Sequence, residues 1–226
     1  MASKDYKIGL IHATMNSVQP ILEAFQVHEP QVRLINFMDE SLIFELNETG
    51  FVTKDMKRRL LNLVEKAVKS GVDGVLLTCS SFTPVVEEIS HLFDVPVLTA
   101  DLSMLENAIE IGHQIGVIAT VEAAGPTTTK LLEKRALEKG KEISIKTEVI
   151  PDAFQALQNR DSVKHDELIH KKVEELRGNC DVILFAQFSM ARALKRIDDV
   201  TTPILTSPQT SVKAIVHEIS KREVVL

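Results

Sequence analysis

Cys79 is the side chain of this sequence whose type and surroundings best suit acid–base or covalent chemistry. It ends the apolar run Gly74–Thr78 and is followed by Ser80, Ser81 and a helical pattern that starts near Pro84. Backbone N–H groups and the positive end of a helix dipole would favour an anion here and lower the pKa of the thiol. Such a thiolate could act as a base or a nucleophile. The alternative is a buried cysteine that packs as a small apolar group.

Polar side chains recur directly after the predicted strands, where they could bind a ligand. Hydroxyls and neighbouring backbone N–H groups can hold a carboxylate without a buried cation. For each hydroxyl the alternative role is to cap a helix N-terminus, and for the asparagine it is to form a turn. The candidate substrate-binding residues are Thr14, Asn16, Ser80, Ser81, Thr120 and Ser189.

The remaining chemical candidates favour structural roles. Cys180 precedes a strand at its amino end, and we predict that it is structural. We expect His12 to be packed and hydrogen-bonded, and Asp166 to be a capping or first-turn acid of a helix. The seven histidines form no metal-binding spacing, and two cysteines cannot make a four-cysteine zinc site, so no metal is predicted. Glycine-rich phosphate motifs are absent, so we expect no nucleotide cofactor.

Composition narrows the class of protein. The 226 residues are 44% hydrophobic and 26% charged, which suits one large or two small globular domains and excludes collagenous, disordered and disulfide-scaffold classes. The net charge is −6, and the longest basic run, Lys57–Arg59, leads into a leucine-rich helical pattern. We therefore predict a solvated helix face there and no nucleic-acid partner. No apolar segment approaches the roughly 18 residues that a membrane span needs, so we expect no membrane partner and a cytoplasmic location.

An internal repeat organises the chain. Three apolar runs recur in the same order about 107 residues later: Ile8–Thr14 with Ile115–Thr120, Asp73–Leu77 with Asp181–Phe185, and Val95–Thr99 with Thr202–Thr206. We infer two homologous halves related by a pseudo-twofold axis. Residues 1–105 with 208–226 form the half that carries Cys79, and residues 106–207 form the half that carries Gln187.

Each half is predicted to be α/β with a parallel sheet. Short runs rich in Val, Ile and Leu are typical of strands buried on both faces, and helical patterns lie between them. The predicted strands are Lys7–His12, Arg33–Phe37, Gly74–Thr78, Val95–Thr99, Ile115–Ala119, Ser144–Val149, Val182–Ala186 and Ile204–Thr206. Open parallel sheets bind ligands outside the carboxyl ends of their strands. Cys79 and Gln187 are equivalent in the repeat, so we expect both to approach one ligand in an active-site cleft between the halves.

Four segments together resemble the aspartate/glutamate/hydantoin racemase superfamily. They are IGLIHAT from Ile8, LLTCSSFTP around Cys79, IGVIAT from Ile115 and ILFAQFSMA around Gln187. The resemblance covers essentially the whole chain. It implies a cofactor-independent enzyme of two pseudo-symmetric α/β halves, with a cysteine from each half on opposite faces of a small carboxylate. In such enzymes one thiolate removes the α-proton and the other thiol delivers a proton to the opposite face.

The resemblance makes Cys79 the first of these cysteines and places Gln187 where the second would be. Glutamine has no proton to exchange at physiological pH, which argues against a symmetric two-base racemase. Gln187 could instead donate its amide N–H to a substrate carboxylate or enolate. The superfamily includes relatives with one essential cysteine that resemble decarboxylases or isomerases of maleate type.

Three functions follow for the sequence. The first is a cofactor-independent isomerase or lyase that acts on a small carboxylate through Cys79. The second is a cysteine-nucleophile hydrolase, and the third is a carboxylate-binding protein without turnover. A homo-oligomer is possible in each case.

Overall fold

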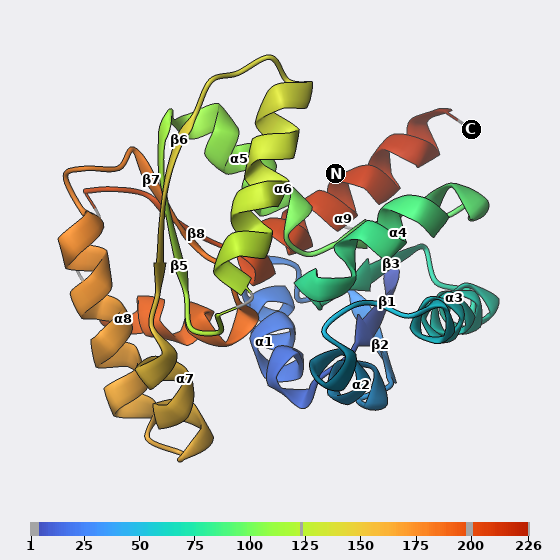
Figure 1. Ribbon diagram of the computed structural model, residues 1–226. Coiled ribbons are helices and arrows are strands. Elements are labelled where there is room, and N and C mark those ends of the chain that lie inside the picture. The colour runs from blue at the N-terminus through green and yellow to red at the C-terminus, as the bar shows by residue number, and fades with distance from the viewer. Residues whose placement is uncertain (1–4, 123, 198–200, 226) are drawn as a thin grey trace. The chain divides into compact units, whose positions relative to one another are not determined.

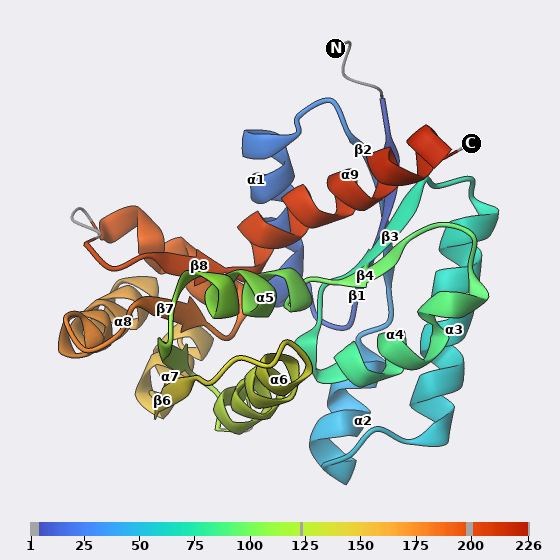
Figure 2. The same cartoon turned by 90° about the horizontal axis from the view of Figure 1, so that it is seen from above.

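The computed structural model describes residues 5–122, 124–197 and 201–225 (Figure 1). The chain divides into two compact units. Unit 1 comprises Met1–Leu102 and Pro208–Leu226, and unit 2 comprises Ser103–Ser207. Each unit is built on its own four-stranded parallel sheet covered by helices, which confirms the predicted α/β fold class (Figure 2).

The sheet of unit 1 has the strand order β2-β1-β3-β4. Its strands are β1 (Lys7–His12), β2 (Arg33–Met38), β3 (Gly74–Leu77) and β4 (Val97–Thr99), and all neighbours run parallel. Every residue of β3 is buried, as expected for a central strand between two helical layers.

Helices cover both faces of this sheet (Figure 2). The α-helices of unit 1 are α1 (Val18–His28), α2 (Ser41–Thr49), α3 (Lys54–Lys69), α4 (Thr83–Ile89) and most of α9 (Ser207–Val225); short 3₁₀ helices are η1 (Met15–Ser17), η2 (Ser80–Phe82) and η3 (Ser90–Leu92). Helix α9 lies so close to β3 that a Cβ on Gly74 would stand 2.9 Å from Ile219 Cδ1. A glycine at this point therefore allows the C-terminal helix to pack against the strand.

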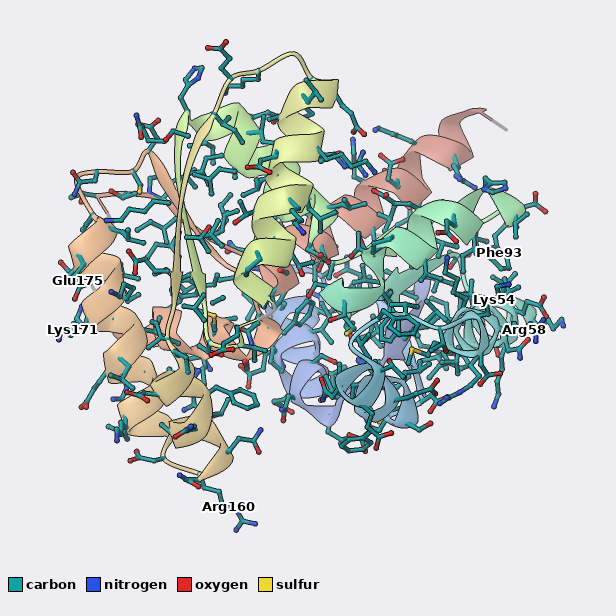
Figure 3. All side chains as sticks on the ribbon, viewed as in Figure 1. Lys54, Arg58, Phe93, Arg160, Lys171 and Glu175 are labelled. Carbon is teal, nitrogen blue, oxygen red and sulfur yellow. The ribbon has the colours of Figure 1, made fainter. Side chains whose placement is uncertain are left out.

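Helix α3 shows how the sequence specifies these elements. Its N-terminus is capped by the Thr53 hydroxyl, which accepts a hydrogen bond from the Met56 N–H at 3.2 Å. Met56, Leu60 and Val64 recur at helical spacing and are buried against the sheet. In the basic run, Arg58 is exposed (Figure 3). Lys57 pairs with Glu88, and the half-buried Arg59 pairs with Asp39 and Glu45. The predicted solvated face is thus present at Lys57 and Arg58, whereas Arg59 connects α3 to Asp39 and to α2.

The sheet of unit 2 has the matching strand order β6-β5-β7-β8. Its strands are β5 (Gln114–Ala119), β6 (Ser144–Val149), β7 (Val182–Phe185) and β8 (Ile204–Thr206). Its helices are α5 (Leu102–Ile111), α6 (Ala124–Glu138), α7 (Pro151–Gln158), α8 (Ser162–Leu176) and the 3₁₀ helix η4 (Phe188–Arg196).

Successive residues of β7 point into two separate apolar clusters. Val182 and Leu184 pack with residues of α5 and α6, whereas Ile183 and Phe185 pack with residues of α8 and η4. This alternation is the period of two of a β-strand, with a core on each side of the sheet. The strand is held from both faces, so its carboxyl end is a rigid support for Gln187.

The predicted strand ends agree with the structure to within one residue except in β4, and the larger differences concern α2, β4 and η4. Helix α2 was not predicted, because its short run lacks a side-chain N-cap and is marked only by Gly50 in the left-handed conformation at its end. Strand β4 starts at Val97 rather than Val95, since Pro96 between them has no N–H to donate. The helical pattern between β7 and β8 forms a 3₁₀ helix, η4, that starts directly after Gln187.

Candidate functional site

Cys79 lies two residues beyond the end of β3, in extended backbone conformation, and precedes η2. Its side chain is only 8% exposed and packs in the core of unit 1 with Ile11, Ala13 and Phe82. Burial raises the pKa of the thiol to about 11, and hydrogen bonds from Ser81 offset this shift only in part. The predicted lowering of the Cys79 pKa is therefore wrong: removal from water outweighs the favourable N–H groups. At neutral pH the structure holds Cys79 as a thiol.

The other polar candidates of unit 1 surround the carboxyl ends of β1 and β3. The Thr14 hydroxyl accepts a hydrogen bond from the Asn16 N–H at 3.3 Å and so caps η1. Asn16 is exposed, and Ser80 and Ser81 are half-buried within η2. Thr14 thus takes the capping role that was the alternative to binding, while the amide of Asn16 faces solvent.

Gln187 occupies the equivalent position of unit 2, two residues beyond the end of β7. Its Oε1 lies 2.6 Å from the backbone N of Thr120, 3.3 Å from that of Val121 and 3.1 Å from the Thr120 hydroxyl. All three groups donate, so this oxygen takes the place that an anion would take in such a cradle. The Gln187 side chain therefore occupies the place at the end of β5 where these donors could otherwise bind a carboxylate. Ser189 lies half-buried in the following 3₁₀ helix.

His12 is buried at the end of β1 in a network of hydrogen bonds, as predicted. Its Nδ1 lies 2.8 Å from the Thr78 hydroxyl and 3.3 Å from the Ser17 hydroxyl, and its Nε2 lies 3.0 Å from Asn36 Oδ1. The Asn36 oxygen requires a donor, so Nε2 carries the proton and Nδ1 accepts. Burial lowers the pKa of His12, with the Asn36 hydrogen bond opposing this shift. The neutral ring ties the loop after β1 to β3.

We expect His12 to make the stability of unit 1 fall below neutral pH. The unfolded chain binds a proton at about pH 6.5, whereas the buried ring binds it only at lower pH, so stability is lost as the pH falls through the unfolded value. The slope should reach at most about 1.4 kcal/mol per pH unit. Urea unfolding between pH 7.5 and 5 measures it, and His12→Gln should flatten the curve. An unchanged slope in the variant would assign the pH dependence to other groups.

Two further residues lie apart from these positions. Asp166 is not a helix cap, because Asp161 caps α8 by accepting from the Lys164 N–H. Asp166 is instead buried, 2.8 Å from Nδ1 of His165, and it pairs with Arg192 of η4. This correction gives Asp166 a tertiary role in holding η4 against α8. Cys180 is half-buried at the amino end of β7, as predicted, and burial raises its pKa.

Asp101, which follows β4, is a buried acid that was not among the residues predicted from the sequence. This carboxyl group is 5% exposed, and its Oδ2 accepts a hydrogen bond from the Thr83 hydroxyl at 3.0 Å. Its Oδ1 is buried without a hydrogen-bond partner among the described residues. The only signal in the sequence was one acid two residues beyond a predicted strand. That signal becomes informative only once β3, which leads to Cys79, is known to be the neighbour of this strand.

Within residues 5–122, 124–197 and 201–225, no group of three His, Cys, Asp or Glu side chains could hold a metal ion. None of the helices in these ranges is both long enough and apolar enough to cross a bilayer.

Comparison with known proteins assigns the fold to a family. The model of the Asp/Glu/Hydantoin racemase family matches residues 8–215. The chain belongs to this family. A glutamate racemase from Trichodesmium erythraeum is 25% identical over 123 residues, which are 54% of this chain and 44% of that protein. The match thus spans less than half the length of this relative.

Solved structures of other proteins share the fold. An aspartate racemase homologue from Pyrococcus horikoshii OT3 superposes with a TM-score of 0.71 at 17% identity, over 95% of this chain and 99% of that one. An arylmalonate decarboxylase superposes with a TM-score of 0.62 at 13% identity, over 94% and 92% of the two chains. At these identities the likeness establishes the architecture and leaves the chemistry to the site residues.

Proposed function

We propose that this racemase-family protein is a cofactor-independent isomerase or lyase that acts on a small carboxylate through the single thiol of Cys79. One observation carries the proposal. Cys79 and Gln187 each lie two residues beyond the third strand of their unit, and only Cys79 has a proton to exchange. Chemistry that needs one proton-transferring group therefore fits this pair better than racemisation by two thiols.

The protonation state of Cys79 indicates the direction of the proton transfer. A thiol with a pKa of about 11 is protonated at neutral pH, so it is ready to donate. A carbanion or enediolate formed on the substrate would take this proton, leaving a thiolate that regains its proton from water. Proton delivery is the step required in a lyase that removes carbon dioxide, and the arylmalonate decarboxylase of the same fold is named for such a reaction.

Gln187 serves this chemistry as a hydrogen-bond donor. Because its Oε1 is held by Thr120 and Val121, its Nε2 has a fixed direction. The structure gives Nε2 no hydrogen-bond partner among the described residues. We assign it to an oxygen of the substrate carboxylate or enediolate, where negative charge builds up. Asn16, Ser80, Ser81 and Ser189 are the further polar groups that we assign to substrate binding. Thr14 and Thr120 act indirectly, since Thr14 caps η1 and Thr120 holds Gln187.

The test is incubation with small dicarboxylates and α-substituted acids in D₂O, followed by NMR. The panel includes both enantiomers of aspartate and glutamate, maleate, and malonates substituted at the α-carbon. We expect one class of acid to give a product with one deuterium at the reacting carbon, and no such product with Cys79→Ser. Absence of both product and exchange across the panel, with the Cys79 region still shifted by ligand, would instead favour a binding protein.

The hydrolase alternative has a different signature. A cysteine-nucleophile hydrolase would leave an acyl group on Cys79 when turnover is quenched, and mass spectrometry would detect it. The raised pKa of Cys79 disfavours this function, since the nucleophile is the thiolate. Accumulation of an acyl-enzyme would overturn the proton-transfer proposal.

A further inference from the structure

Asp101 and Cys79 are neighbours at the carboxyl end of the unit 1 sheet. Strands β3 and β4 pair in parallel with Leu77 opposite Thr99, and the Ala100 N–H donates to the Leu77 carbonyl at 3.0 Å. Cys79 and Asp101 each follow this last pair by two residues, and the hydroxyl of Thr83, four residues after Cys79, donates to Asp101 Oδ2 at 3.0 Å. The chain segments that carry the two residues therefore leave adjacent strands at the same edge of the sheet. The carboxyl group is therefore a neighbour of the thiol.

Both groups are removed from water. Cys79 is 8% exposed and Asp101 is 5% exposed. The Thr83 hydroxyl holds one carboxyl oxygen, and the other has no hydrogen-bond partner among the described residues. An unpartnered carboxylate oxygen in a buried site keeps its charge unneutralised, so its field acts strongly on a neighbouring group. Its charge raises the pKa of Cys79, adding to the larger effect of burial.

The surrounding charges do not cancel this field. Burial raises the pKa of Asp101 to about 6, and the nearby Glu87 of α4 raises it further rather than lowering it. Asp101 is thus ionised at neutral pH. His12, at the end of β1, contacts Thr78 and stays uncharged near neutral pH because burial lowers its pKa.

We propose that Asp101 is a positioning residue that keeps Cys79 in the thiol form, so that Cys79 delivers a proton to the substrate and does not remove one. This inference rests on the proposed function and narrows its substrate class. The substrate must generate its own carbanion, as an acid with two carboxylates on one carbon does when it loses carbon dioxide. The C–C bond breaks and leaves its electron pair on carbon, the S–H bond breaks to protonate that carbon, and the thiolate takes a proton from water.

The test is titration of the Cys79 thiol by its thiolate absorbance near 240 nm, in a Cys180→Ser background. The same protein with Cys79→Ser supplies the baseline, including the signal of Tyr6. Removing the neighbouring charge with Asp101→Asn should lower the Cys79 pKa by about one unit. The matched control is Glu88→Gln, which removes an exposed acid of α4 and should leave the titration unchanged. Equal titration curves for Asp101→Asn and the parent would overturn the inference.

A second measurement needs no variant at Asp101. In protein labelled with ¹³C at its Asp carboxyl groups, the Asp101 resonance should show an additional step at the pH where Cys79 ionises, because coupled groups share their titrations. Cys79→Ser should abolish this step, and its absence in the parent would overturn the inference. Neither titration uses substrate. A protein that passes both but processes no acid would disprove the proposed function alone, whereas Cys79-dependent turnover without either effect would disprove the inference alone.

Discussion

Replacing Cys79 with serine should lower kcat/KM at least about 100-fold on the acid that the deuterium experiment identifies, because general acid–base groups typically contribute 10²–10⁴-fold. Serine replaces the thiol by a hydroxyl of similar size, but an alcohol is a far weaker acid than a thiol. The packing of Ile11 and Phe82 around the site should survive the change. Product formation followed by NMR measures the loss, and thermal unfolding checks that the fold is intact.

The matched control is Cys180→Ser. Cys180 is half-buried at the amino end of β7, the end of the strand opposite to the one that leads into Gln187. We expect its replacement to change kcat/KM by no more than about twofold and to act through stability, as a substitution away from reacting groups does. Full activity in Cys79→Ser, or equal losses in the two variants, would show that the family fold is present without the chemistry assigned to it.

The sheets were predictable from the sequence because their signal is local. Buried parallel strands need short runs of Val, Ile and Leu, and the repeat of Ile8–Thr14 at Ile115–Thr120 marked the same strand twice. The shared strand order of the two units follows from that duplication. What the sequence pattern could not predict was that η4 is a 3₁₀ helix, because a 3₁₀ helix uses the same residues as an α-helix and differs in its hydrogen bonds.

The protonation state of Cys79 and the contacts of the buried acids were not predictable from local sequence. The thiol of Cys79 is buried by Ile11 from β1 and Phe82 from η2, and the balance between their desolvation and the N–H groups is a tertiary property. That Asp101 lies near Cys79 follows only from the pairing of β3 with β4. Asp166 is similar: its sequence position suggests a cap, but its partner Arg192 lies 26 residues away in another element.

The second prediction concerns Gln187, because the two polar atoms of its carboxamide, Oε1 and Nε2, have separate roles. Its Oε1 accepts from the N–H groups of Thr120 and Val121, and its Nε2 has no hydrogen-bond partner within the described part of the chain. In the unmodified protein these N–H groups already have an acceptor, so an added anion gains little by binding there. Two substitutions separate the tasks: Gln187→Ala removes both, and Gln187→Glu keeps the acceptor while replacing the donor by oxygen.

Gln187→Ala and Gln187→Glu should both lower kcat/KM by about 10- to 100-fold, since a hydrogen bond to a charged group contributes about 1.5–3 kcal/mol. Only Gln187→Ala should gain anion binding, because it leaves two N–H groups and the Thr120 hydroxyl without their acceptor. Titration with sulfate or acetate should then shift the ¹⁵N amide signals of Thr120 and Val121 in Gln187→Ala but not in the parent or in Gln187→Glu. Equal shifts in all three proteins would show that Gln187 does not occupy the cradle in solution. Full activity in Gln187→Glu would show that the substrate needs no donor from this side chain.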